Sequence, residues 1–166
     1  MAEERTRSEY RLTLPLVASV QAVDAQAIEP QDHEALAELM LDAYAGTVDD
    51  EGETMVEARG AIDHYMAAAP DDLRWVVRDG GRPIAFCCVV EVDDRLYVDP
   101  IVVAANHKRR RLGTALVAHA VAVVGQRGAV EVGAAITDGN VASENLFRSL
   151  GARRVGPWPP ASRGSS

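Results

Sequence analysis

The segment VAANHKRRRLGTAL, residues 103–116, joins the end of an apolar strand to a helix through a turn with four consecutive cations. The first turn of a helix exposes unpaired backbone N–H groups at the positive end of the helix dipole, where phosphate groups bind well. Gly113 and Ala115 carry little or no side chain, so a ligand or a neighbouring strand can come close. The segment predicts a diphosphate-binding turn. The alternative is a basic, solvated loop before a surface helix.

The sequence on either side of this turn predicts a mixed α+β fold, because helical and strand periodicities follow one another along the chain. The predicted strands lie within residues 12–23 and over 74–78, 83–92, 96–104 and 130–136. The predicted helices cover residues 32–44, 54–68, 111–127 and 141–150. We expect one domain over residues 11–156, a disordered start over 1–10 and a flexible tail over 157–166.

Composition narrows the class of protein. The chain has 166 residues, of which 48% are apolar, so it can bury a core without disulfides or metal. No apolar run approaches the roughly 20 residues that span a bilayer, and the charged start lacks a signal-peptide core. The net charge of -8 argues against general nucleic-acid binding. We therefore expect a cytoplasmic protein with no nucleic-acid or membrane partner and no metal site, and we expect Cys87 and Cys88 to stay reduced.

Residues 103–116 resemble the acetyl-CoA signature of the GNAT acyltransferase superfamily, in which a strand ending in Val precedes Arg/Gln-x-x-Gly-x-Gly/Ala at a helix start. Matched without gaps, Lys108 takes the Arg/Gln position, Arg111 the first glycine and Gly113 the second small position. A shifted match, Arg110-x-x-Gly113-x-Ala115, satisfies the pattern literally but moves the helix start. In the gapless match Arg111 still offers its backbone N–H, since only the side chain differs.

A second segment, residues 140–152, resembles Asn-x-x-Ala-x-x-Leu-Tyr-x-x-x-Gly-Phe of the same family. Asn140, Leu146 and Gly151 match, whereas Ser143 replaces Ala and Phe147 replaces Tyr. The resemblance implies that Asn140 lies near the pantetheine arm of coenzyme A. Phe147 has no hydroxyl, so it cannot protonate the leaving thiolate as the family's Tyr often does. It is expected to be a core aromatic or to line the coenzyme A groove.

The resemblance implies a mostly antiparallel, twisted sheet that splays at a bulged strand and is flanked by about four helices. Asp99-Pro100 falls where the family has this bulge, which also suits a proline that cannot donate to a strand ladder. The implied co-substrate is acetyl-CoA. The residues expected to bind it are Ile101, Val102, Val103, Lys108, Arg109, Arg110, Arg111, Leu112, Gly113, Thr114, Ala115, Asn140, Ser143 and Phe147.

The implied reaction is attack of a primary amine on the thioester, which needs a base for the amine and a donor for the carbonyl oxygen. Asp99 is the candidate base, Tyr97 is a second candidate, and a strand N–H near residues 101–103 is the candidate donor. The acidic residues between the first two helices are expected to attract a small-molecule or peptide amine. They are Asp49, Asp50, Glu51 and Glu53.

Three hypotheses follow from the sequence: an N-acetyltransferase, a non-catalytic acyl-CoA-binding sensor or interaction module of the same fold, and a nucleic-acid-binding protein that uses residues 108–111. The absence of a tyrosine at position 147 is an argument for the second against the first. A homodimer is compatible with all of them.

Overall fold

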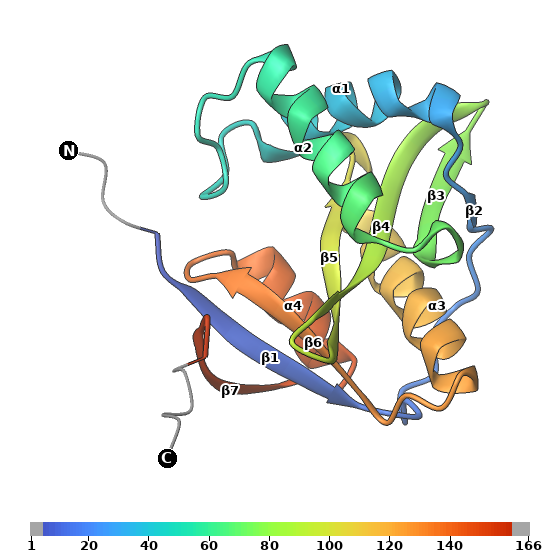
Figure 1. Ribbon diagram of the computed structural model, residues 1–166, viewed down its shortest axis with the longest axis vertical. Coiled ribbons are helices and arrows are strands. Elements are labelled where there is room, and N and C mark those ends of the chain that lie inside the picture. Colours follow the sequence, from blue (N-terminus) through green and yellow to red (C-terminus); the bar gives the residue numbers. More distant parts are fainter. Residues whose placement is uncertain (1–4, 161–166) are drawn as a thin grey trace.

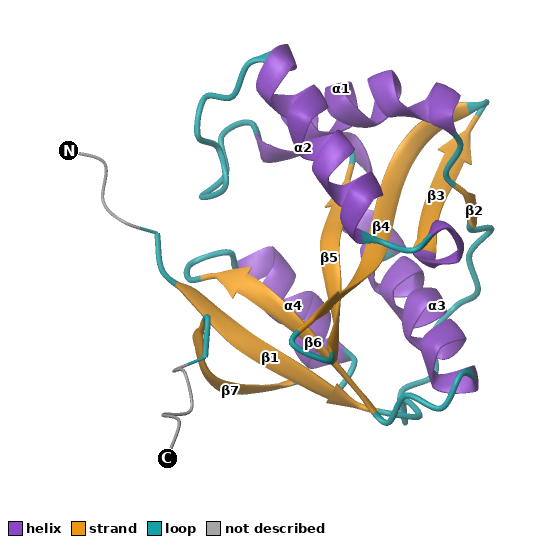
Figure 2. Ribbon diagram, in the orientation of Figure 1, coloured by secondary structure: helices purple, strands orange, loops and turns teal. Residues whose placement is uncertain are grey.

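The structure is a computed structural model that describes residues 5–160, without the side chains of residues 108–110. Its described residues form one seven-stranded sheet in the order β2-β3-β4-β5-β6-β1-β7, flanked by four α-helices (Figures 1 and 2). The strands are β1 (Arg7–Thr13), β2 (Gln26–Ala27), β3 (Arg74–Asp79), β4 (Arg82–Val92), β5 (Arg95–Val103), β6 (Glu131–Thr137) and β7 (Arg153–Trp158). The helices are α1 (His33–Tyr44), α2 (Met55–Ala68), α3 (Leu112–Gln126) and α4 (Val141–Ser149).

Helices cover both faces of the sheet. Successive side chains of a strand point to opposite faces, so Cys87 of β4 packs in a core with α3 and α4, whereas Cys88 packs in a core with α1 and α2. Both cysteines are buried and free, as expected from their adjacent positions. Among the described residues, no helix is both long and apolar enough to cross a membrane.

Local sequence signals fix several boundaries. Thr54 begins α2, where its hydroxyl accepts a hydrogen bond from Glu57 N at 3.2 Å and the Glu57 carboxylate accepts in return. Gly80 and Gly81 adopt φ of 57° and 81° in the β3–β4 hairpin, and Gly151 adopts 95° after α4. These glycines supply left-handed backbone where a turn or a helix end requires it.

The sheet divides between β5 and β6. These two strands are parallel but share only the pair Tyr97 and Gly133, and Figure 1 shows them running apart beyond it. On the other side of β5, the register shifts between Cys87 and Val89 of β4, so Asp99 and Pro100 form a bulge opposite one residue. The predicted fold class, the splayed sheet and the bulge at Asp99-Pro100 are confirmed.

The expected ends of the chain need correction. The first strand runs from Arg7 rather than within residues 12–23, so the expected disorder over residues 1–10 is wrong from Arg7 onward. Strand β7 extends to Trp158, where a tail was expected. Neither strand was predicted there, because charged residues in β1 and turn-forming residues in β7 are not typical of strands. Glu9 and Arg11 are buried in β1 because they pair with each other at 3.2 Å, and Gly156 and Pro157 lie in an edge strand that tolerates proline.

Candidate active site

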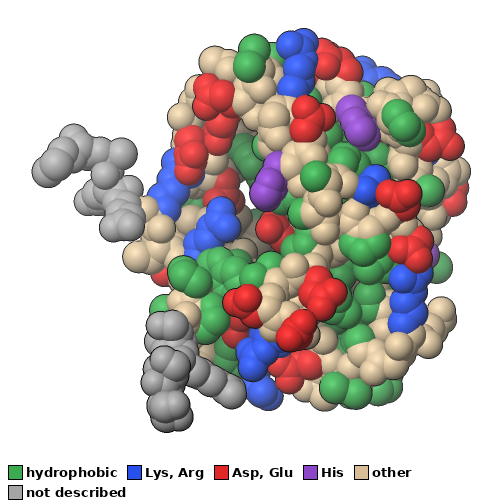
Figure 3. All heavy atoms as spheres, viewed as in Figure 1, with side chains coloured by type: hydrophobic (Ala, Val, Ile, Leu, Met, Phe, Trp, Pro, Cys, Tyr) green, Lys and Arg blue, Asp and Glu red, His purple; other side chains and the backbone are tan. Residues whose placement is uncertain are grey.

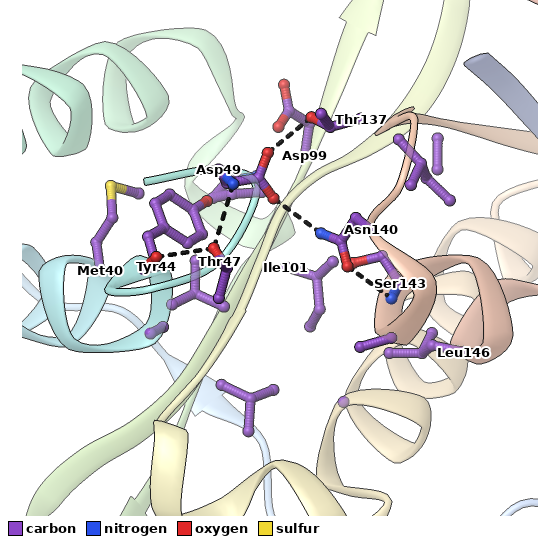
Figure 4. A pocket seen from close by; sticks show the side chains of 18 of the residues that line it. Met40, Tyr44, Thr47, Asp49, Asp99, Ile101, Thr137, Asn140, Ser143 and Leu146 are labelled. Atoms are coloured by element: carbon purple, nitrogen blue, oxygen red, sulfur yellow. Dashed lines mark hydrogen bonds between the residues drawn. The ribbon is translucent and has the colours of Figure 1, made fainter. Parts of the chain in front are cut away.

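The divergence of β5 and β6 opens a cleft of about 1230 Å³. One wall comes from α1, α2 and the acidic loop of residues 45–54, and the other comes from β6 and α4. The bulge of β5 and the start of α3 line it as well. Figure 4 shows Asp99 and Ile101 of β5 between Tyr44 on one side and Asn140 and Ser143 on the other. The surface is hollowed here, with acidic and basic side chains around the rim (Figure 3).

The floor of the cleft offers backbone hydrogen-bonding groups. Ala104 N donates to Ile84 O of β4 at 2.8 Å. Because the N–H groups of successive strand residues point to opposite edges, those of Ile101 and Val103 point away from β4, toward β6. Strand β6 pairs with β5 only at Gly133, so these two N–H groups face the cleft without a ladder partner. Of the strand N–H groups near residues 101–103, these two are therefore the candidates for donating to a bound ligand.

Asp99 differs from every other acid that lines the cleft. It is half-buried, and its carboxylate makes no hydrogen bond or ion pair with any residue that the structure describes. Burial raises the pKa of its carboxyl above the ordinary value, and the nearby Arg7 and His64 oppose this shift only in part. A carboxylate without partners, with a raised pKa and an open approach, can accept a proton.

The four acids of the loop, by contrast, already have partners. The two oxygens of Asp50 accept from Gly46 N and Gly52 N at 2.9 Å, which lowers its pKa. Glu51 pairs with Arg5 at 3.3 Å, and Glu53 accepts from Glu51 N at 3.2 Å.

Asp49 accepts one hydrogen bond from Thr137 at 2.7 Å and one from Asn140 at 2.8 Å, as Figure 4 shows. All four acids line the cleft as expected. Their oxygens, however, chiefly hold the loop in place.

The start of α3 shows what two positions of its signature require. Arg111 occupies the glycine position of the gapless match and adopts a left-handed conformation, with φ 54° and ψ 22°. A Cβ on Gly113 would lie 2.8 Å from Leu146 Cδ1 and 3.3 Å from Val103 Cγ2, so this glycine lets α3 pack against α4 and β5. The first turn of α3 faces the cleft through Arg111, Gly113 and Thr114.

Arg111→Gly is expected to stabilise the protein, because a side chain in the left-handed region strains the backbone. Compared with Arg111→Ala, which removes the same charge but keeps the strain, the glycine variant should be more stable by about 1 kcal/mol. Urea unfolding of the two variants measures the difference. Equal stability would show that this turn relaxes without cost.

Most of the residues expected to bind the co-substrate line the cleft. They are Ile101, Val102, Val103, Arg111, Gly113, Thr114, Asn140, Ser143 and Phe147. Leu112 and Ala115 do not, because their side chains pack toward the core beneath α3. The side chains of Lys108, Arg109 and Arg110 lie outside the described residues. Phe147 is 2% exposed, so it is a core aromatic, and it also lines the cleft.

Tyr97, the second candidate base, lies outside the cleft. Its hydroxyl donates to Glu9 at 2.7 Å and accepts from Arg11 at 3.0 Å, and its ring packs on Trp158. A Cβ on Gly133 would lie 2.7 Å from this ring. Tyr97 therefore holds β5 against β6 and β1 at the closed end of the splay, and its proton is committed to Glu9.

Tyr97→Phe should lower the free energy of unfolding by about 1–3 kcal/mol, since it leaves buried polar groups without one partner. Turnover should change by less than about twofold, because hydrophobic packing survives and no reacting group is lost. Thermal unfolding and steady-state rates test both parts. A large loss of turnover at unchanged stability would return Tyr97 to the catalytic residues.

Sequence reasoning missed two phenols of the cleft. Tyr44 of α1 and Tyr65 of α2 both line it, and burial raises the pKa of both hydroxyls, with Asp99 adding to the shift. Both tyrosines continue the apolar stripe of a helix, so no local pattern distinguishes them from core residues. Among the described residues, no cluster of His, Cys, Asp and Glu could hold a metal ion.

The profile of the Acetyltransferase (GNAT) family matches residues 33–152, well over half of the chain. The chain therefore belongs to the GNAT acetyltransferase family. The matched region contains both segments that resembled this family and all of the wall formed by α1 and α2. No curated protein matches the chain.

Solved structures share the fold. A GNAT-family acetyltransferase from Colwellia psychrerythraea has a TM-score of 0.73 at 12% identity, over 93% of this chain and 54% of that one. A GCN5-related N-acetyltransferase from Sphaerobacter thermophilus has a TM-score of 0.70 at 17% identity, over 92% of this chain and 49% of that one. The chain thus spans about half the length of these two. The ribosomal-protein-S18-alanine N-acetyltransferase of Escherichia coli has a TM-score of 0.60 at 21% identity, over 77% of this chain and 76% of that one.

Proposed function

We propose that this protein transfers an acetyl group from acetyl-CoA to a primary amine inside the cleft between β5 and β6. The observation that carries the proposal is that Asp99 lies next to the unpaired edge of β5. Its carboxylate has no partner at the bulge, and the backbone N–H groups of Ile101 and Val103, further along the same strand, face the same cleft. A base for an amine and donors for a carbonyl oxygen are what acyl transfer requires.

The cleft suits the shape and chemistry of acetyl-CoA. Its pantetheine arm is extended and contains two amides, so it can lie along the unpaired edge of β5 as an added strand would. One of the two N–H groups, of Ile101 or Val103, would hold the arm, which leaves the other for the thioester oxygen. The first turn of α3 at residues 112–114 would hold the diphosphate, because helix N-termini bind phosphate.

The residues of the cleft divide the reaction between them. Asp99 takes one proton from the ammonium group, which leaves a neutral amine that attacks the thioester carbon. As the new C–N bond forms, an N–H of Ile101 or Val103 stabilises the charge on the oxygen. The C–S bond then breaks. The remaining surplus proton on nitrogen passes to the sulfur through water, since Phe147 has no hydroxyl to donate.

Charge around the cleft favours a cationic acceptor. Six acids line it, against three arginines among the described side chains. Two of the loop acids, Asp50 and Glu51, are exposed at the rim, where they attract cations by their field even though their oxygens already have partners. We expect an acceptor amine that is protonated in solution.

One observation favours a second function. Because Phe147 replaces the usual acid, the chain fits an acyl-CoA-binding module without turnover as well. Calorimetric titration with acetyl-CoA, followed by thiol release across a panel of small amines and peptide N-termini, tests both functions. We expect micromolar binding and release of thiol with at least one cationic amine. Tight binding with no thiol release from any amine would replace catalysis with sensing, and no binding would overturn both.

A further inference from the structure

The acidic loop of residues 45–54 is tied across the cleft to the opposite wall. Asp49 Oδ1 accepts from the Thr137 hydroxyl at the end of β6, and Asp49 Oδ2 accepts from the Asn140 amide at the start of α4. Figure 4 shows these two bonds reaching from the loop to both elements. The three residues form what we call the Asp49 clasp.

The clasp is built into the loop and the opposite wall. On the loop side, Asp49 N donates to Thr47 Oγ1 at 3.2 Å, and that hydroxyl donates to Tyr44 O at 2.7 Å. On the far side, Asn140 Oδ1 accepts from Ser143 N at 3.1 Å and thereby caps α4. Asp49 therefore connects the last turn of α1 to the first turn of α4.

We propose that Asp49 is a positioning residue whose clasp fixes the acceptor-side loop over the bound acetyl-CoA arm. This proposal rests on the proposed function and assigns Asp49 a structural contact in place of direct recognition of the amine's charge. Both of its oxygens are already occupied by donors from the opposite wall, so neither faces the acceptor unpaired.

The clasp can stay closed while a ligand is bound. An Asn side chain has two amide hydrogens and two carbonyl lone pairs. Asn140 uses one hydrogen for Asp49 and one lone pair for Ser143, which leaves one of each for an amide of the pantetheine arm. The same residue can thus touch the arm and hold the loop, so the two walls of the cleft act as one unit.

Two substitutions separate the contact from the charge. Asp49→Ala removes both bonds. Asp49→Asn removes the charge but can keep both bonds, because its amide oxygen can accept from Asn140 while its amide nitrogen donates to the Thr137 hydroxyl. We expect hydrogen exchange of residues 45–54 in the free protein to quicken about 10- to 100-fold in the alanine variant and to stay near wild type in the asparagine variant.

Steady-state kinetics should likewise separate Asp49→Ala from Asp49→Asn. We expect Asp49→Ala to raise KM for the amine and for acetyl-CoA about 10-fold with kcat within about threefold, and Asp49→Asn to restore both. Thr137→Val should add nothing to the alanine variant, since the bond is already lost. Asp63→Asn, an exposed acid of α2 outside the cleft, controls for the change in charge.

Each alternative has its own result. If Asp49→Asn raises KM for the amine as much as Asp49→Ala does, Asp49 recognises charge and the clasp proposal is wrong. Unchanged exchange in Asp49→Ala would also overturn it. Failure of the wild-type protein to bind acetyl-CoA would refute the proposed function and the ligand-positioning role together, whereas the exchange result would still decide whether the clasp holds the loop.

Discussion

Asp99→Asn is expected to lower kcat/KM for the amine by about 10²- to 10⁴-fold, the usual contribution of a general base. The side chain keeps its shape, so affinity for coenzyme A should not change. The loss should be confined to the step that removes the proton, because Asp99 is the one cleft acid without a partner among the described residues. Steady-state kinetics and calorimetry measure the two effects separately.

The pH dependence gives this prediction a second test. Burial raises the pKa of Asp99, so the acid limb of wild-type kcat/KM should have its midpoint above the ordinary aspartate value of about 3.9. In Asp99→Asn this limb should disappear. Full activity in the variant, or an unchanged acid limb, would exclude Asp99 as the base.

The same substitution should stabilise the protein at neutral pH. A carboxyl whose pKa is higher in the folded state binds its proton more tightly there, so the stability of the wild type falls as pH rises between the unfolded and folded pKa values. Above that window the wild type carries a buried charge that Asn lacks. The variant should therefore melt at higher temperature at pH 7, and its advantage should vanish at about pH 3, below the ordinary pKa. A lower melting temperature at pH 7 would show that the carboxylate is stabilised by its surroundings.

Thr114→Glu should weaken binding of coenzyme A by about 100-fold or more. Thr114 lines the cleft in the first turn of α3, where we propose that the diphosphate binds. Two like charges about 4 Å apart near a surface repel by roughly 4 kcal/mol, which is sufficient for this loss. An acid in a first helical turn favours the helix itself, so the fold should not be weakened.

Thr114→Gln is the matched control, since it has nearly the same size and no charge. It should bind coenzyme A with an affinity within about fivefold of the wild type, because the N–H groups of the turn are unchanged. If the Glu and Gln variants bind equally well, the diphosphate lies elsewhere. Gly113 is a poorer position for this test, because any side chain there meets Leu146 and Val103.

Strong local signals made most of the fold predictable. Helix α2 begins at its capping box, and the β3–β4 hairpin turns at two glycines, because both features depend on neighbouring residues alone. Strand β1 was misplaced and strand β7 was missed for the opposite reason. The buried charges of β1 are stable because Glu9 and Arg11 bond to each other and to Tyr97 of β5, two strands away in the sheet. No local pattern contains that contact.

The residues of the candidate site also divide into those that local sequence predicts and those that depend on distant contacts. The bulge placed Asp99 in the cleft, because Pro100 marks it in the sequence. Tyr97 was misassigned because its partners on β1 are almost 90 residues away in the chain. The acids of the loop were expected to attract the amine. The structure pairs each of them, and Asp49 reaches the end of β6 and the start of α4, which only the folded chain brings near.

Residue-resolved hydrogen exchange with and without acetyl-CoA tests the central claim most directly. The N–H groups of Ile101 and Val103 face the cleft, whereas that of Val102 points toward β4, as the bond from Ala104 to Ile84 requires. Saturating acetyl-CoA should slow exchange at residues 101 and 103 and leave residue 102, the internal control, largely unchanged. Unaltered exchange at Ile101 and Val103, with protection elsewhere in the chain, would show that acetyl-CoA does not bind along β5.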